Sequence, residues 1–360
     1  MKAIVKAKPV GGREGTELRD VPAPKPGRGE VVVKVLASGL CGSDRHIYNW
    51  TGGMDEYIKP PRVYGHEFCG EVAELGPHVK KHLAVGDYVS AEMHVTCGSC
   101  YLCRTGQGHV CQETKILGIH DDGCFAEYVK VPARNVLKLD RTLIPPRVGA
   151  FLDALGNAVH VAFEFPFTGR SVAVTGYGPI GAMAASIAHM GGAGAVHITE
   201  IAPFALERAR EWKKSTGAEH VYIYDTSQGG DEAVAAIRES TGGGTDLLWE
   251  MSGDPRAIND GFRMLRPGGV AALLGLPKDP RVTIGRYYSD VIWRGLTLKG
   301  IVGRRMFETW HRMLALFEGG LRVEHVVTGE FEGLEKFLEA METFNDGRSL
   351  KVVVYPGGKP

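Results

Sequence analysis

The chain has 360 residues, more than one hydrophobic core usually organises, so we expect two domains. Its 42 basic residues balance 42 acidic ones, and the sequence has no basic stripe interleaved with aromatic residues, which argues against a nucleic-acid partner. No apolar run is long and continuous enough for a signal peptide or a membrane span, so we expect a cytoplasmic protein with no membrane partner.

The first part of the chain, residues 1–157, contains short strand-like segments that Gly and Pro repeatedly interrupt. The clearest of these segments are 30–36, 70–74, 88–91 and 125–131. This rhythm predicts an irregular, mostly antiparallel β domain.

From residue 171 onward, strand-like and helix-like segments alternate regularly. The strand candidates are 171–175, 196–200, 221–224, 246–251 and 270–274. The helix candidates follow them, ending near 190 and spanning 204–216, 231–241 and 257–265. Such alternation predicts an α/β fold with a doubly wound parallel sheet covered by helices on both faces.

The tail from about residue 297 returns to the character of the first part, with 351–355 as a closing strand. We therefore assign residues 1–157 and 297–360 to a first domain and residues 158–296 to a second. These limits rest on the change of rhythm alone.

A glycine motif opens the second domain. Gly176, Gly178 and Gly181 form GxGxxG directly after the strand SVAVT and directly before a helix, with Pro179 near the start of that helix. The glycines permit a tight turn, a close approach of backbone to a pyrophosphate, and close packing of helix on strand. In this context the motif predicts a dinucleotide-binding turn.

The second strand of this domain ends on Glu200, nineteen residues after Gly181. An acidic residue at this point accepts hydrogen bonds from the adenosine ribose and repels a 2′-phosphate, which favours NAD over NADP. Arg208 and Arg210 lie nearby and keep NADP open as an alternative.

Four cysteines, Cys97, Cys100, Cys103 and Cys111, follow the spacing CxxCxxCx7C. Four thiolates so close in sequence are typical of a closed, structural zinc site. An iron–sulfur cluster is the main alternative, but the fourth cysteine is not followed by Pro and no second cysteine cluster accompanies it. The remaining two cysteines outside any motif, Cys69 and Cys124, are expected to be small buried side chains.

A second set of potential metal ligands is dispersed along the chain. Cys41 lies in CGSDRH, His66 and Glu67 lie in GHE, and Asp153 lies in LDALGNAV. A catalytic zinc usually keeps about three protein ligands and one open position, which these residue types can supply. Spacing alone leaves the assignment open, because an isolated His66 is also typical of a hydrogen-bonded core histidine.

Taken together, the CGxD motif, GHE, the four-cysteine segment and the GxGPxG turn resemble the zinc-containing medium-chain alcohol dehydrogenases. The resemblance extends over nearly the whole chain. Within that superfamily the chain is most similar to the members that act on L-threonine. The segments that carry this similarity are CGSDRHIYNW (41–50), HVTCGSCYLCRTGQGHVC (94–111), GCFAEY (123–128), LGNAVH (155–160) and GRRMFETW (303–310).

The resemblance implies a GroES-like catalytic domain, a Rossmann NAD-binding domain and a homotetramer. It implies one catalytic and one structural zinc ion, with the catalytic ion held by Cys41, His66, Glu67 and Asp153. It also implies a proton relay through Ser43 and His46, and Glu67 is counted among the catalytic residues. The full set of expected cofactor contacts is Gly176, Gly178, Pro179, Ile180, Gly181, Glu200, Leu274 and Ile301.

The implied reaction is hydride transfer from the secondary hydroxyl of L-threonine to NAD, giving 2-amino-3-oxobutanoate in threonine catabolism. The family more often has Thr at the position of Ser43, and the segment 51–61 departs further from the family pattern. Two alternatives remain: a zinc polyol or secondary-alcohol dehydrogenase of the sorbitol or butanediol type, and a non-catalytic nucleotide-binding relative.

Overall fold

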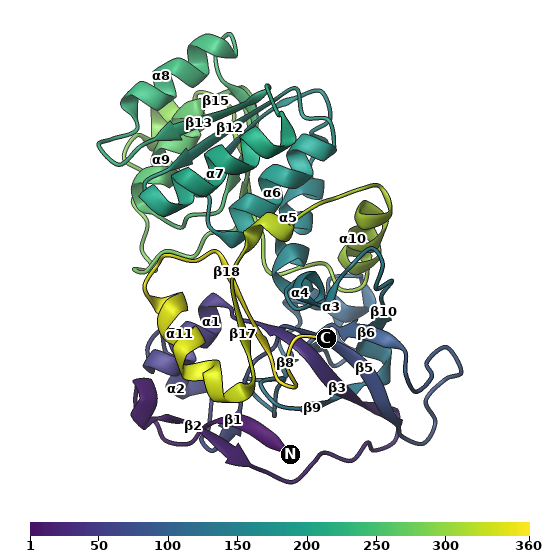
Figure 1. Cartoon of the computed structure of the whole chain (residues 1–360). Helices are drawn as coiled ribbons and strands as arrows, with labels where there is room; N and C mark the ends of the chain where they lie inside the picture. Colours follow the sequence, from purple (N-terminus) through teal and green to yellow (C-terminus); the bar gives the residue numbers. More distant parts are fainter. The chain divides into compact units, whose positions relative to one another are not determined.

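The computed structural model describes residues 1–360 and divides into two compact units (Figure 1). The first unit comprises Met1–Ala154, Arg305–Glu318 and Val327–Pro360, and the second comprises Leu155–Arg304 and Gly319–Val326. The second unit thus begins at 155 and runs to 304, compared with the range 158–296 expected from the sequence. It runs further because strand β16 (Thr297–Gly300) pairs in parallel with β15 (Leu265–Leu273).

The main sheet of the first unit has seven strands, with β9 paired to β3 beside the path β10-β6-β5-β3-β18-β17. All of its pairs are antiparallel except β17 with β18. The predicted antiparallel β architecture is therefore confirmed. The strands are β3 (Glu30–Gly39), β5 (Phe68–Leu75), β6 (Tyr88–Ala91), β9 (Tyr128–Pro132), β10 (Val136–Lys138), β17 (Val327–Glu332) and β18 (Lys351–Tyr355).

Smaller elements complete the first unit. Its strands are β1 (Lys2–Lys6), β2 (Thr16–Asp20), β4 (Arg62–Val63), β7 (His94–Val95) and β8 (Lys115–Ile116). Its helices are α1 (Gly42–Asn49), α2 (Met54–Tyr57), α3 (Tyr101–Arg104), α4 (Pro146–Gly149), α10 (Glu308–Glu318) and α11 (Phe337–Asn345). The 3-10 turns are η1 (Gly12–Glu14), η2 (Gly108–Val110), η3 (Ala133–Asn135) and η6 (Leu334–Lys336). Tyr64, Phe125 and Phe337 pack ring against ring in the core.

The sheet of the second unit has the order β13-β12-β11-β14-β15-β16, and every pair is parallel. The chain starts in the middle and winds outward in both directions, so β11 and β14 form a switch point at which ligands bind to such sheets. The remaining strands are β11 (Ser171–Thr175), β12 (Ala195–Glu200), β13 (Val221–Asp225) and β14 (Thr245–Glu250). The predicted doubly wound parallel sheet is confirmed.

One helix precedes the first strand of this sheet in the chain, and further helices then alternate with the strands. They are α5 (Leu152–Glu164), α6 (Pro179–Met190), α7 (Pro203–Thr216), α8 (Asp231–Ser240) and α9 (Pro255–Met264), with the π-helix η4 (Tyr287–Ile292) and the turn η5 (Glu324–Val326). β11 is buried almost throughout, as a central strand covered on both faces must be. None of the helices combines the length and apolar character that crossing a bilayer would require.

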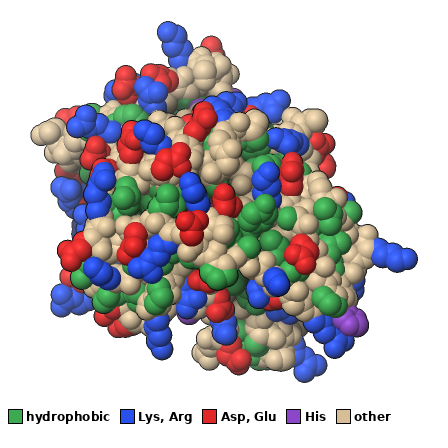
Figure 2. All heavy atoms as spheres, turned by 60° about the horizontal axis from the view of Figure 1, so that its bottom comes forward, with side chains coloured by type: hydrophobic (Ala, Val, Ile, Leu, Met, Phe, Trp, Pro, Cys, Tyr) green, Lys and Arg blue, Asp and Glu red, His purple; other side chains and the backbone are tan.

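Acidic and basic side chains alternate over the surface shown in Figure 2, and apolar side chains are scattered among them. The balance of 42 basic and 42 acidic residues in the sequence therefore extends to this face as a mixture of the two signs.

Candidate active site and metal sites

The four sulfur atoms of Cys97, Cys100, Cys103 and Cys111 converge in the segment around α3. The sulfur atoms lie 3.7 Å apart for Cys97–Cys111, 3.8 Å for Cys100–Cys111 and 3.9 Å for Cys97–Cys103. A zinc ion at about 2.3 Å from each of four tetrahedral thiolates sets their mutual distance at about 3.8 Å. The cluster therefore fits one zinc ion, whereas a four-iron cluster would separate its thiolates further because each binds a different iron.

Backbone N–H groups support these sulfur atoms. The amide of Cys100 donates to Cys97 Sγ at 3.4 Å, and the amide of Cys103 donates to Cys100 Sγ at 3.5 Å. Hydrogen bonds from the backbone of Ser99 and Cys100 lower the pKa of Cys97 to about 6. The loop thus favours a thiolate at Cys97, and the thiolate is the form that binds metal.

Cys41, His66 and Glu67 form a second cluster, in which one ligand atom from each residue lies within 4.8 Å of the others. Cys41 precedes helix α1, at the end of β3, while His66 and Glu67 lie in the loop before β5. The loop turns at Gly65, whose φ is +97° and whose Cα faces the Phe125 ring so closely that a Cβ would lie 2.6 Å from it. Only glycine fits at this turn.

The His66 ring lies between two polar neighbours. Its Nδ1 atom is 3.6 Å from Asp44 Oδ1, and its Nε2 atom is 3.4 Å from Ser43 Oγ. Burial disfavours the charged ring, but Asp44 and Cys41 outweigh this effect and raise the pKa of His66. A carboxylate at Nδ1 is the usual partner of a metal-binding histidine, since it leaves Nε2 for the ion.

Glu67 has a partner that the sequence did not indicate. Lys351 Nζ donates to Glu67 Oε2 at 2.6 Å and to the carbonyl oxygen of Leu40 at 3.0 Å. Burial raises the pKa of the Glu67 carboxyl, and the Lys351 ammonium opposes this shift. Glu67 Oε1 is buried without a hydrogen-bond partner, so the carboxylate keeps one oxygen available for an ion. Lys351 stands in the apolar strand KVVVY, where nothing in the sequence marks its partner.

Asp153, near the start of α5, belongs to a different group of neighbours. A ligand atom of Asp153 lies within 4.8 Å of those of Glu92 and His94, and the negative charge of Asp153 contributes to raising the pKa of Glu67. Glu92 Oε1 accepts from His94 Nδ1 at 2.8 Å, and Glu92 Oε2 accepts from Trp310 Nε1 at 2.9 Å. Glu92 and His94 were not among the site residues predicted from the sequence, although His94 begins one of the segments that carry the family resemblance.

His46 lies on α1, one turn beyond Ser43. Its Nδ1 atom is 3.1 Å from Thr51 Oγ1, and the ring faces Gly52, where a Cβ would lie 2.9 Å from the same nitrogen. The segment after α1 therefore fixes the orientation of this ring.

The glycine motif lies at the switch point of the second unit. Gly176 has φ +87°, and a Cβ on Gly181 would lie 2.0 Å from the carbonyl oxygen of Gly176, so both positions require glycine. Gly178 precedes α6 and Pro179 is its first residue, which leaves the N–H groups of the first turn free for phosphate oxygens. Ile180 lies in the same first turn and is half-buried. This close packing of backbone fits a dinucleotide pyrophosphate.

Glu200 ends β12 beside this turn. Its Oε2 atom accepts from the amide of Tyr177 at 2.6 Å, while Oε1 accepts from the amides of Ile201 and Ala202 at 2.6 and 2.8 Å. Leu274 follows β15, and the buried Ile301 follows β16, so both lie at the carboxyl ends of strands in the same sheet.

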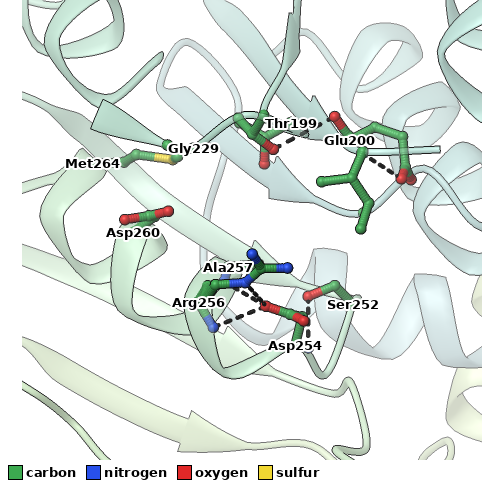
Figure 3. A pocket seen from close by; sticks show the side chains of 13 residues that line it. Thr199, Glu200, Gly229, Ser252, Asp254, Arg256, Ala257, Asp260 and Met264 are labelled. Atoms are coloured by element: carbon green, nitrogen blue, oxygen red, sulfur yellow. Dashed lines mark hydrogen bonds and ion pairs between the residues drawn. The ribbon is translucent and has the colours of Figure 1, made fainter. Parts of the chain in front are cut away.

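A pocket opens beside Glu200 at the carboxyl ends of the strands (Figure 3). Its lining combines the glycine turn with residues that follow β12, β13 and β14. They are Gly176, Thr199, Glu200, Ile201, Thr226, Gly229, Gly230, Ser252, Asp254, Arg256, Ala257, Asp260 and Met264.

A glycine turn at the switch point of a parallel sheet, together with two clusters of potential zinc ligands in a β unit, is typical of zinc-containing, nucleotide-dependent dehydrogenases. Residues 27–141 match the alcohol dehydrogenase GroES-like domain, and residues 179–319 match the zinc-binding dehydrogenase domain. The chain therefore belongs to the zinc-binding alcohol dehydrogenase family. This membership makes it an enzyme of that family and argues against the non-catalytic alternative.

Two relatives with the same named activity are similar to the chain over nearly its whole length. The chain is 42% identical over 355 residues to the L-threonine 3-dehydrogenase of Pyrococcus horikoshii, covering 98% of each chain. It is 43% identical over 359 residues to the L-threonine 3-dehydrogenase of Bacillus velezensis, covering 99% of each.

Solved structures with the same fold differ more widely in their named activity and in the cofactor that they bind. The 2R,3R-butanediol dehydrogenase from Bacillus subtilis aligns with a TM-score of 0.85 at 26% identity. An alcohol dehydrogenase from Escherichia coli, solved with NADH, aligns with a TM-score of 0.85 at 25% identity. A putative zinc-binding dehydrogenase from Sinorhizobium meliloti, bound to NADP, aligns with a TM-score of 0.86 at 29% identity. Each alignment covers 99% of both chains.

Proposed function

We propose that the chain oxidises the secondary hydroxyl of L-threonine, passing a hydride to NAD and giving 2-amino-3-oxobutanoate. The observation that carries this proposal is the cluster of the half-buried Cys41 with the buried His66 and Glu67, in a chain that matches L-threonine 3-dehydrogenases over nearly its whole length.

Cys41, His66 and Glu67 would hold a catalytic zinc ion, with Asp153 close enough to influence the Glu67 carboxyl. When bound, zinc supplies Lewis acidity that favours loss of the substrate's hydroxyl proton. Asp44 orients His66 through Nδ1, and Lys351 holds one oxygen of Glu67, so both side chains are set before substrate arrives.

The proton would leave through α1. The hydroxyl of Ser43 can accept one proton while it donates another, and the His46 imidazole can accept a proton at one ring nitrogen and release one from the other. Thr51 holds the His46 ring in one orientation, which suits a relay that must accept and release protons from fixed positions. Glu67 or Asp153 would supply the negative charge that a substrate ammonium needs.

Glu200 supports NAD as the cofactor. Its carboxylate lies at the glycine turn, and Asp254 and Asp260 add two further carboxyl groups to the pocket, against the single guanidinium of Arg256. A 2′-phosphate would enter this pocket against a net negative charge. Related folds have been solved with NADH and with NADP, so cofactor choice rests on these side chains.

The second zinc ion would occupy the Cys97 cluster and stabilise that loop without taking part in the reaction, because four protein ligands leave no open position. Free thiols throughout the chain are compatible with the reducing cytoplasm that we propose as its location.

The competing function is oxidation of an uncharged diol, which the likeness to butanediol dehydrogenase favours. The experiment that separates the two is the rate of NAD reduction with L-threonine, L-serine, 2,3-butanediol and sorbitol, before and after treatment with a chelator. A chelator-sensitive rate dominated by L-threonine is expected. Activity confined to an uncharged diol would transfer the proposal to the competing substrate class.

A homotetramer is the proposed assembly. The edge strand β16 is exposed at every residue, and the segment between β15 and β16 carries large exposed apolar side chains: Leu276 is 90% exposed, Trp293 71% and Tyr288 65%. An unpaired edge with apolar neighbours is suited to pairing with a second copy of the chain. Light scattering on the purified protein would test this, and a monomer would contradict it.

A further inference from the structure

The pocket in the second unit continues beyond Glu200. Figure 3 shows Asp260 on the side of the pocket opposite Glu200, with Gly229 and Met264 nearby. In the proposed function Glu200 binds the adenosine ribose, so the adenine base would occupy the space on this far side. The inference below therefore rests on the proposed use of a dinucleotide.

The Asp260 carboxylate accepts a hydrogen bond from Arg263. Its Oδ1 atom accepts from Arg263 Nη1 at 3.0 Å, and the same Nη1 lies 2.7 Å from Asp231 Oδ1. Burial raises the pKa of the Asp260 carboxyl, and the Arg263 guanidinium opposes this shift and favours the ionised form. The carboxylate thus has a fixed orientation before any ligand binds.

The second oxygen of Asp260, Oδ2, faces the loop after β13. A Cβ on Gly230 would lie only 2.0 Å from this oxygen, so any larger residue at 230 would displace the carboxylate. Because position 230 is glycine, the Asp260 side chain keeps its place in the pocket lining, where Oδ2 can accept a hydrogen bond.

We propose that Asp260 determines the choice of base, selecting adenine over 6-oxopurines by accepting a hydrogen bond from the 6-amino group. Adenine presents an N–H donor at this position, whereas hypoxanthine and guanine present a carbonyl oxygen that a carboxylate repels. A hydrogen bond to a charged group changes affinity by about 10- to 100-fold.

Arg256 provides a matched control in the same pocket. Its side chain is 80% exposed, and its Nε atom lies 3.6 Å from Asp254 Oδ1. A guanidinium that stacks on the face of a base tolerates every base, because each has a π-surface. Loss of Arg256 should therefore weaken adenine and hypoxanthine dinucleotides alike.

The test is calorimetric binding of NAD and of nicotinamide hypoxanthine dinucleotide to the full chain, as wild type, Asp260→Asn and Arg256→Ala. We expect the wild type to prefer NAD at least tenfold. Asp260→Asn should bring the ratio of dissociation constants close to one, because an amide can accept from an amino group or donate to a carbonyl. Arg256→Ala should keep the wild-type ratio.

A wild type that binds both dinucleotides equally, or an Asp260→Asn variant that keeps the preference, would overturn the role of Asp260 while leaving NAD as the cofactor. Absence of binding by either dinucleotide would overturn the proposed function as well. Thermal unfolding of each variant shows whether the fold is retained. Asp260→Glu keeps the charge and gives a second measure of selectivity. This variant should still prefer NAD, and equal binding of the two dinucleotides by it would also contradict the proposal.

Discussion

Lys351 Nζ lies 2.6 Å from Glu67 Oε2, and the two side chains are 2% and 0% exposed. The pair joins the last strand of the chain to the loop that carries His66. It places a positive charge beside a cluster whose own members are a thiol, an imidazole and a carboxyl group. A fully buried charge needs such a partner, because its desolvation is otherwise uncompensated.

Lys351→Met is expected to destabilise the fold by about 3–5 kcal/mol, since it leaves the Glu67 carboxylate buried without its counter-charge. Chemical denaturation measures this change. Lys351→Arg serves as the control because it retains the charge, and it should lose less stability than Lys351→Met. Equal stability of Lys351→Met and the wild type would show that the pair contributes nothing.

Cys41→Ser is expected to lower the turnover number more than about 100-fold, because changes even outside the direct ligands of a metal cost about 10- to 100-fold. The bound zinc should fall by half, since the Cys97 cluster remains intact. Elemental analysis of the purified protein measures the zinc. Cys100→Ser is the matched variant and should remove the other half; wild-type turnover in Cys41→Ser would refute the assignment.

Glu200→Ala is expected to raise the KM for NAD by about tenfold or more, because a charged acceptor for the ribose is lost. The ratio of kcat/KM between NAD and NADP should fall in the same variant. Glu200→Gln separates charge from shape, since it keeps the side-chain length and removes the repulsion of a 2′-phosphate. An unchanged ratio in both variants would count against Glu200 as the ribose ligand.

His197 predicts a loss of stability in mild acid. The side chain is 1% exposed, and burial lowers the pKa of His197 from 6.5 to about 4. The unfolded chain therefore binds more protons than the folded chain between these pH values, so stability present above pH 6.5 is lost as the pH falls toward 4.

His197→Phe should make stability less dependent on pH in that range, because the aromatic ring can still pack against Tyr222 without having to remain unprotonated. Unfolding midpoints measured from pH 7 to pH 4.5 test this. The exposed His82, replaced by Asn, is the control. The prediction fails if both variants lose stability in acid as steeply as the wild type.

Much of the fold and part of the site could be predicted from local sequence. Gly176 and Gly181 identify the turn because only glycine tolerates the approach of backbone found there, and the cysteine spacing brings four sulfur atoms together within one short loop. Both features are local, so each is complete within a few residues of sequence.

The rest depends on contacts between distant segments. Lys351 reaches Glu67 across 284 positions, and Trp310 reaches Glu92 across 218, so no spacing rule could have paired them. The place of β16 depends on such a contact as well: in the sequence it resembles an isolated short segment, and only its pairing with β15 makes it part of the parallel sheet.

Asp44 has two tasks that a single substitution cannot separate. Its Oδ2 atom accepts from the amide of Cys41 at the start of α1, and its Oδ1 atom faces the ring of His66 at 3.6 Å. A screen for folded protein and a screen for turnover would therefore both identify position 44. For that reason, intolerance to mutation at position 44 would not show whether the start of α1 or the orientation of His66 had been disturbed.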